Sequence, residues 1–185
     1  MRLLIMGPPG AGKGTQAAIL AERLRIPHIS TGDLFRANLA DNTALGQEAK
    51  KYMDAGEYVP DSVTNDMVRN RLESDDAASG FLLDGYPRTL AQVAELDEML
   101  TDSSIDRVLV LSADTDAVVA RLLHRASEQQ RTDDTEEIIR HRMDVYSEQT
   151  APLIELYASR GILVEVSGLG AVNEVTEDIS NALGL

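Results

Sequence analysis

A glycine-rich stretch between an apolar run and a helix-forming segment constrains this chain more than any other feature. Residues 2–6 (RLLIM) form a short apolar run of the kind that is buried in a parallel sheet. The stretch GPPGAGKGT follows at 7–15, and residues 13–24 combine good helix formers with an apolar face. In this order, the backbone N–H groups of the loop and the positive end of the helix can bind phosphate. The sequence therefore predicts a phosphate-binding loop.

The loop matches the pattern G-x-x-x-x-G-K-[ST] from Gly7 to Lys13, but Gly14 occupies the hydroxyl position and Thr15 brings the hydroxyl one residue later. Lys13 is expected at the β- and γ-phosphates of a nucleoside triphosphate. Because the hydroxyl is displaced, we expect Mg²⁺ to be held mainly through the nucleotide and water, with no direct protein ligand. The alternative is a glycine-rich turn that only starts a helix.

The charge balance argues against nucleic-acid and membrane partners. The 185 residues, a length that suits one domain, carry 17 basic and 31 acidic side chains and a net charge of −14. Such a chain is repelled by phosphate backbones and anionic lipids. Its apolar runs are far shorter than the roughly 18 residues of a membrane span, and residues 1–9 are too short for a signal peptide. A cytoplasmic location is expected, and the absence of cysteine excludes disulfides, thiol catalysis and cysteine-ligated zinc.

Apolar runs alternate with helical patterns along the whole chain. Strands are expected at 2–6, 27–30, 80–83, 107–111 and 162–166. Helical patterns lie at 13–24, 33–55, 61–73, 89–100, 114–125, 135–159 and 171–183. Asp61 is expected to cap the helix that it starts. This alternation predicts an α/β fold in which helices flank a five-stranded parallel sheet.

Motifs along the chain carry a more specific signal. They are GPPGAGKGTQ at 7–16, STGDLFR at 30–36, DGYPRT at 84–89 and RTDD at 131–134. In this order and spacing they resemble the adenylate kinases, nucleoside monophosphate kinases that interconvert ATP plus AMP with two ADP, and the resemblance covers essentially the whole chain. It implies a P-loop NTPase fold with one core domain over 1–185, an inserted AMP-binding lobe at 30–59 and a short lid at 126–136.

The resemblance also implies two nucleotide sites. The ATP site is expected at Gly10, Ala11, Gly12, Lys13, Gly14, Thr15, Arg121, Arg125 and Gly170. The AMP site is expected at Thr31, Arg36, Glu57, Tyr58, Val59, Gly85, Tyr86, Pro87, Arg88, Gln92, Arg131 and Arg142. By resemblance, Arg36 and Arg88 contact the AMP phosphate, while Thr31 lies near the adenine and Gln92 contacts its edge. From the residues alone, Thr31 also fits a helix N-cap, and Gln92 fits a solvated side chain.

The catalytic residues that the resemblance implies are Lys13, Arg88, Arg125, Arg131 and Arg142. Phosphoryl transfer needs alignment and charge neutralisation more than covalent chemistry, and guanidinium groups together with Mg²⁺ supply both, so we expect no general base. Without the motif register, the arginines also fit an exposed ion-pair network. Asp84, at the end of a strand, either supports Mg²⁺ through water or only caps the turn.

The segment between the arginine-bearing helices is short. It begins with ASEQQR at 126–131, which leaves no room for a long lid that binds zinc. The expected partners are ATP, AMP and ADP, with no nucleic acid and no membrane, and the protein is expected to be a monomer. Two alternatives stay open: a kinase that acts on UMP and CMP, and a P-loop module that binds nucleotides without transferring phosphate.

Overall fold

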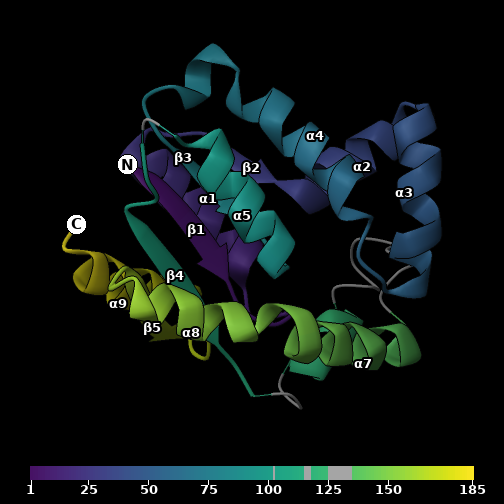
Figure 1. Cartoon of the computed structure of the whole chain (residues 1–185). Helices are drawn as coiled ribbons and strands as arrows, with labels where there is room; N and C mark the ends of the chain where they lie inside the picture. The colour runs from purple at the N-terminus through teal and green to yellow at the C-terminus, as the bar shows by residue number, and fades with distance from the viewer. Residues whose placement is uncertain (102, 115–117, 125–134) are drawn as a thin grey trace.

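The computed structural model describes residues 1–101, 103–114, 118–124 and 135–185 (Figure 1). At its centre, five parallel strands form one sheet in the order β2-β3-β1-β4-β5. The strands are β1 (Arg2–Met6), β2 (His28–Ser30), β3 (Phe81–Asp84), β4 (Arg107–Ser112) and β5 (Leu163–Ser167). Each begins and ends within one residue of its predicted position. The predicted α/β fold is confirmed.

Helices cover both faces of this sheet. Their bounds are α1 (Lys13–Leu24), α4 (Asp61–Leu72), α5 (Leu90–Met99), α7 (Glu136–Val145), α8 (Pro152–Ser159) and α9 (Val172–Leu183), with a 3₁₀ turn η1 (Asp75–Ala77) before β3. Residues 118–124 are also helical. Among the described helices, none combines the length and the apolar character that crossing a membrane requires.

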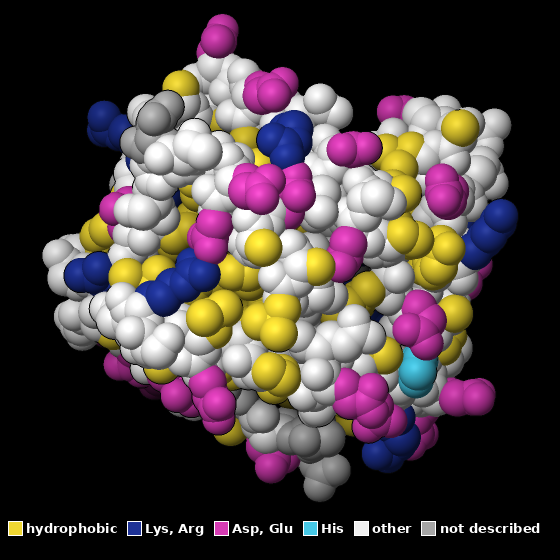
Figure 2. All heavy atoms as spheres, in the orientation of Figure 1, with side chains coloured by type: hydrophobic (Ala, Val, Ile, Leu, Met, Phe, Trp, Pro, Cys, Tyr) yellow, Lys and Arg dark blue, Asp and Glu magenta, His cyan; other side chains and the backbone are white. Residues whose placement is uncertain are grey.

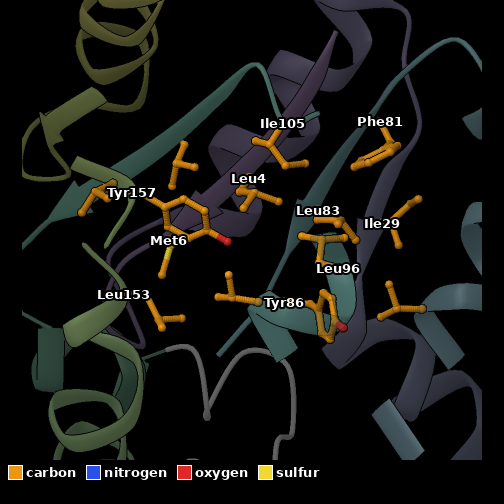
Figure 3. Close-up of a cluster of buried hydrophobic side chains, with 14 of the residues drawn as sticks. Leu4, Met6, Ile29, Phe81, Leu83, Tyr86, Leu96, Ile105, Leu153 and Tyr157 are labelled. Atoms are coloured by element: carbon orange, nitrogen blue, oxygen red, sulfur yellow. The ribbon is translucent and has the colours of Figure 1, made fainter. Parts of the chain in front are cut away.

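A hydrophobic layer lies on each face of the sheet, because alternate side chains of a strand point to opposite sides. Leu3 and Ile5 of β1 pack with α1 and α9, whereas Leu4 and Met6 pack with α4, α5 and α8. Figure 3 shows the second layer, in which Tyr86 and Tyr157 lie among aliphatic side chains. This two-sided burial explains why the strands appear in the sequence as continuous apolar runs.

Two helices, α2 (Thr31–Ala40) and α3 (Ala44–Ala55), stand to one side of the sheet (Figure 1). They have a small core of their own, in which Phe35, Ala49 and Val59 are buried. The helical pattern predicted at 33–55 thus forms two helices rather than one, because Asn42 adopts a φ of 54° and Thr43 caps α3. These helices lie in the segment 30–59 that the motifs predict to be a lobe.

The pattern predicted at 135–159 forms a nearly continuous helical rod. It consists of α7, a π-helix η2 (Tyr146–Thr150) and α8. The lid predicted at 126–136 lies almost entirely outside the described residues. The predicted cap at Asp61 is wrong: Pro60 holds the N-cap position of α4, and Asp61 is its first helical residue.

We predict that Leu83→Ala lowers the free energy of unfolding by about 2–5 kcal/mol, because Leu83 of β3 is 0 % exposed and its loss leaves a cavity between packed layers. The matched control is Leu90→Ala in α5, where the side chain is 62 % exposed and the change should be within about 0.5 kcal/mol. Urea unfolding of both variants measures this, and equal losses would contradict the described core.

Candidate functional site

The predicted phosphate loop lies between the carboxyl end of β1 and the N-terminus of α1. Gly10 has a φ of 81°, a left-handed conformation that suits glycine and lets the loop curl back on itself. Gly12 is the N-cap of α1, so no side chain caps the helix, and its first turn contains no acidic residue. The first N–H groups of α1 and their positive dipole are therefore available to an anion.

Lys13 lies against this loop. Its Nζ donates hydrogen bonds of 2.8 Å to the carbonyl oxygens of Gly7 and Pro8. The ammonium group is thereby held near the curled backbone, where the motif requires a positive charge. The strand, loop and helix thus have the arrangement that the sequence predicts.

A cavity of about 140 Å³ opens beside the loop, between the sheet, the α2–α3 helices and the η2 segment. Most of the residues predicted for the second nucleotide line it. They are Thr31, Arg36, Glu57, Tyr58, Val59, Gly85, Pro87, Arg88, Gln92 and Arg142, and Lys13 joins them from the loop. The structure therefore brings together residues that are more than a hundred positions apart in the sequence.

The cavity concentrates positive charge in an acidic protein. Lys13, Arg36, Arg88 and Arg142 all line it, although the net charge of the chain is −14. On the face shown in Figure 2, by contrast, basic side chains are separated from one another by acidic and apolar ones. Four cationic side chains around one hollow can neutralise several phosphate oxygens, and guanidinium groups match them with paired N–H donors.

Arg36 and Arg88 are each held by contacts with neighbouring groups. Arg36 forms an ion pair with Asp33 on α2. Burial acts to raise the pKa of Asp33, but the hydrogen bond and charge of Arg36 outweigh it, so the pKa lies below its ordinary value. Arg88 donates from Nε to the carbonyl of Gly85 at 2.7 Å. Its guanidinium group is therefore held close to the turn that follows β3.

The aromatic ring of Tyr58 packs against the guanidinium group of Arg88. The guanidinium carbon of Arg88 lies 4.8 Å from the centre of the Tyr58 ring. The Tyr58 hydroxyl is 2.8 Å from Oγ1 of Thr150, which in turn donates to the carbonyl of Arg88 at 2.9 Å. Because Thr150 uses its proton for that carbonyl, Tyr58 is the donor to Thr150. This network joins the segment before α4 to the core through a cation–π contact and two hydrogen bonds.

Thr31 links α2 to the turn after β3. Its Oγ1 donates to the carbonyl of Gly85 at 2.9 Å, while the side chain of Ser30, not Thr31, caps α2. The alternative reading of Thr31 as an N-cap is therefore wrong. Gly85 permits this approach, because a Cβ atom there would lie 2.8 Å from Oγ1 of Thr31.

Gln92 is 1 % exposed, so the alternative reading of a solvated side chain is also wrong. Its Oε1 accepts a hydrogen bond from the backbone N–H of Arg88 at 2.7 Å, and its Nε2 donates to Oδ1 of Asp61 at 2.6 Å. The other oxygen of Asp61 accepts from Oγ1 of Thr89 at 2.9 Å. Asp61 thus holds the lining residue Gln92 in place without lining the cavity itself. Its position at a helix start did not indicate this role.

Tyr146 and Thr150 also line the cavity, and the sequence reasoning missed them. Burial, followed by the proximity of Tyr58 and Glu165, raises the pKa of Tyr146 to about 12, so its hydroxyl stays neutral. A sequence signal existed: 142, 146 and 150 are spaced by four residues, which places them near one face of a helix with Arg142.

Other predicted residues lie outside the cavity. Tyr86 is buried in the core, where its hydroxyl donates to Oδ1 of Asn65 at 2.9 Å. Arg121 donates to the carbonyl of Gly168 at 2.9 Å, close in sequence to Gly170. Of the predicted loop residues, Lys13 lines the cavity, whereas the others do not: Gly10, Ala11, Gly12, Gly14 and Thr15. Arg125 and Arg131 lie outside the described residues.

Asp84 ends β3 beside the loop. Its Oδ2 lies 3.4 Å from Nε2 of His28 and would be 3.7 Å from a Cβ atom at Gly14, so it faces the start of α1. Within the described ranges, no group of three or more acidic or histidine side chains could hold a metal ion. A single carboxylate next to a phosphate loop suits contact with a cation through water better than direct coordination.

Comparisons with known proteins agree with the motifs. The sequence matches the family described as Adenylate kinase over residues 5–162. It is 63 % identical to a protein named Adenylate kinase from Kocuria rhizophila, over 98 % of each chain. A protein of the same name from Nocardioides is 62 % identical over 99 % of this chain and 97 % of its own length. One from Thermobifida fusca is 55 % identical over 99 % and 98 %.

We predict that Tyr58→Leu weakens the binding of AMP, the ligand that the motifs predict for this cavity, by about three- to tenfold, because Arg88 loses the ring beneath it. Tyr58→Phe is the matched control, since it keeps the ring and loses only the hydrogen bond to Thr150, and it should bind AMP more tightly than the leucine variant. Calorimetric titration with AMP measures both. A leucine variant that binds AMP as tightly as the wild type would show that the ring does not position Arg88.

Proposed function

The chain belongs to the adenylate kinase family, and from this premise we propose that the cavity is the AMP site of a reversible phosphoryl transfer from ATP to AMP, which yields two ADP. One observation carries the assignment: Lys13 of the phosphate loop lines the same cavity as Arg36, Arg88 and Arg142. A phosphate held by the loop and a phosphate held by the arginines would therefore meet at one place.

On the acceptor side, Arg36 and Arg88 bind the AMP phosphate. The base end is lined by Thr31, Val59 and Gln92, together with apolar side chains of Phe35 and Met53. Arginine forks suit the phosphate, and the apolar walls suit the faces of a purine. Glu57, Gly85 and Pro87 complete the lining, whereas Tyr86 contributes from the core by supporting the turn.

On the donor side, the backbone N–H groups of 10–15 and Nζ of Lys13 bind the ATP phosphates. Arg121 and Gly170 lie near the ATP base. This assignment is supported by the uncapped N-terminus of α1 and by the hydrogen bond that joins Arg121 to the segment before Gly170. Arg125 and Arg131 are assigned to the site only because of their positions relative to the sequence motifs.

Catalysis rests on position and charge. The arginines around the cavity neutralise the negative charge of the phosphate oxygens, and their partners hold them in place before the nucleotides arrive. Mg²⁺, when bound with ATP, supplies further neutralisation of the phosphates. Asp84 would support it through water. No general base is required, because the accepting oxygen belongs to the ionised phosphate of AMP and carries no proton to remove.

The short lid at 126–136 closes over the ATP, and the lobe at 30–59 closes over the AMP. Their closure excludes water, which would otherwise accept the phosphoryl group. The closure of the lobe is supported by its contact with α7, where Nε2 of His141 lies 2.6 Å from Oε1 of Glu57 in the segment 30–59. The protein acts as a monomer in the cytoplasm, and its net charge supports the absence of nucleic-acid and membrane partners.

The experiment that tests the function is a coupled assay with ATP, Mg²⁺ and each of AMP, CMP, UMP and GMP. AMP is expected to give the highest kcat/KM. Without an acceptor, ATP hydrolysis should stay far below the transfer rate, because the site is complete only when both nucleotides are bound. Faster turnover on CMP than on AMP would instead identify a pyrimidine kinase.

Replacing Arg88 separates transfer from binding. Arg88→Met should lower kcat/KM for AMP by roughly 10²–10³-fold, because the acceptor phosphate loses its forked partner, while ATP affinity stays nearly unchanged. Arg140→Met is the matched control, since Arg140 lies on α7 and pairs with Glu136 at the surface, and it should retain activity. Steady-state kinetics and ATP titration measure this. Equal loss of ATP binding and transfer would favour a binding module without phosphotransfer.

A further inference from the structure

We propose that Asp61 determines which nucleotide bases the cavity accepts, by holding the side-chain amide of Gln92 in one orientation. The inference rests on the proposed function, because it takes the base of the acceptor nucleotide to lie against Gln92. Asp61 does not line the cavity itself, so it acts as a positioning residue through Gln92.

The contacts of Gln92 leave only one orientation of the amide. The backbone N–H of Arg88 can only donate, and it lies 2.7 Å from Oε1. The carboxylate of Asp61 accepts, and its Oδ1 lies 2.6 Å from Nε2. A reversed amide would place NH₂ against N–H and a carbonyl oxygen against a carboxylate. Both contacts would be repulsive in a position that is 1 % exposed, where water cannot compensate.

Asp61 is itself held in place. Its second oxygen accepts a hydrogen bond of 2.9 Å from Oγ1 of Thr89, the residue that caps α5. Gln92 lies in the first turn of the same helix. Asp61 on α4 and Gln92 on α5 are therefore fixed relative to each other by two hydrogen bonds to one carboxylate.

The amide keeps part of its hydrogen-bonding capacity for a ligand. An amide oxygen has two lone pairs and an amide nitrogen has two hydrogens, and the two contacts use one of each. Gln92 can therefore offer one acceptor and one donor to the cavity, in an order that Asp61 and Arg88 determine. A glutamine without these anchors could turn over and offer the reverse order.

This order separates two classes of base. Adenine carries an amino donor at position 6 and an acceptor at N1, whereas hypoxanthine and guanine carry a carbonyl acceptor at position 6 and a donor at N1. An amide that pairs with adenine thus faces hypoxanthine with acceptor against acceptor and donor against donor. Sites that leave buried polar groups unpaired reject the wrong ligand strongly. The fixed amide selects bases that carry an amino group next to a ring nitrogen acceptor, and the size of the cavity then selects among these bases.

The test compares AMP with inosine monophosphate (IMP), which differs from AMP only in the groups at positions 6 and 1 of the base. Wild-type protein is expected to prefer AMP in kcat/KM. In Asp61→Asn the preference should fall by about three- to tenfold, because an asparagine amide accepts either orientation of Gln92 and only the N–H of Arg88 then opposes the reversed one. The matched control is Asp66→Asn, which removes the same charge from an exposed position on α4 and should keep the wild-type ratio.

The ratio of two acceptors in one variant separates specificity from folding, because a purely structural defect lowers both activities together. An unchanged ratio in Asp61→Asn, or equal losses on AMP and IMP, would overturn the proposal. Gln92→Leu provides a second test that does not depend on the folding of the Asp61 variant: it should abolish most of the preference, and a retained preference would also overturn the proposal. Wild-type protein that transfers phosphate equally to AMP and IMP would refute this inference alone. Protein that transfers to no monophosphate would refute the proposed function.

Discussion

The parallel pairing of β1 with β3 is the constraint on which the rest of the site depends. In this register Ile5 lies beside Asp84, so both strands end at the same edge of the sheet. The phosphate loop that follows β1 and the turn of 84–88 that follows β3 therefore emerge side by side. A parallel sheet with crossover helices produces such an edge, and ligands bind there in open α/β folds. Lys13 and Arg88 share one cavity because of this pairing.

Neutral groups help to orient the positive charge in the cavity. Lys13 donates to two backbone carbonyls, and Arg88 donates to one and lies over an aromatic ring. The Gly85 carbonyl and the Tyr58 ring orient Arg88 without cancelling its charge, so its guanidinium group keeps its attraction for phosphate. Arg36 differs, since it pairs with Asp33 at the rim. A site that must neutralise phosphate oxygens within an acidic protein gains from this choice of partners, because local contacts act at short range and the net charge is screened by salt.

The turn after β3 connects most of the acceptor-side contacts. The Gly85 carbonyl accepts from both Thr31 and Arg88, the Arg88 N–H binds Gln92, and the Arg88 carbonyl accepts from Thr150. Four elements, α2, α5, η2 and β3, thus meet at one short backbone segment. Small displacements of this turn would move the phosphate-binding and base-binding ends of the cavity together, which couples their geometry.

Sequence alone predicted the strands to within one residue, because a strand buried on both faces must be apolar throughout and short runs such as 2–6 have few other uses. It also predicted the phosphate loop, because a strand, a glycine-rich turn, a lysine and a helix start in this order direct backbone N–H groups and positive charge toward one point. Tertiary structure decided what local rules could not. Asp61 fits a helix cap by position, yet its carboxylate binds Gln92 and Thr89 at another helix. Thr31 also fits a cap by position, yet the side chain of Ser30 caps α2. Such partners are distant in sequence and adjacent only after the sheet assembles, so no local pattern specifies them.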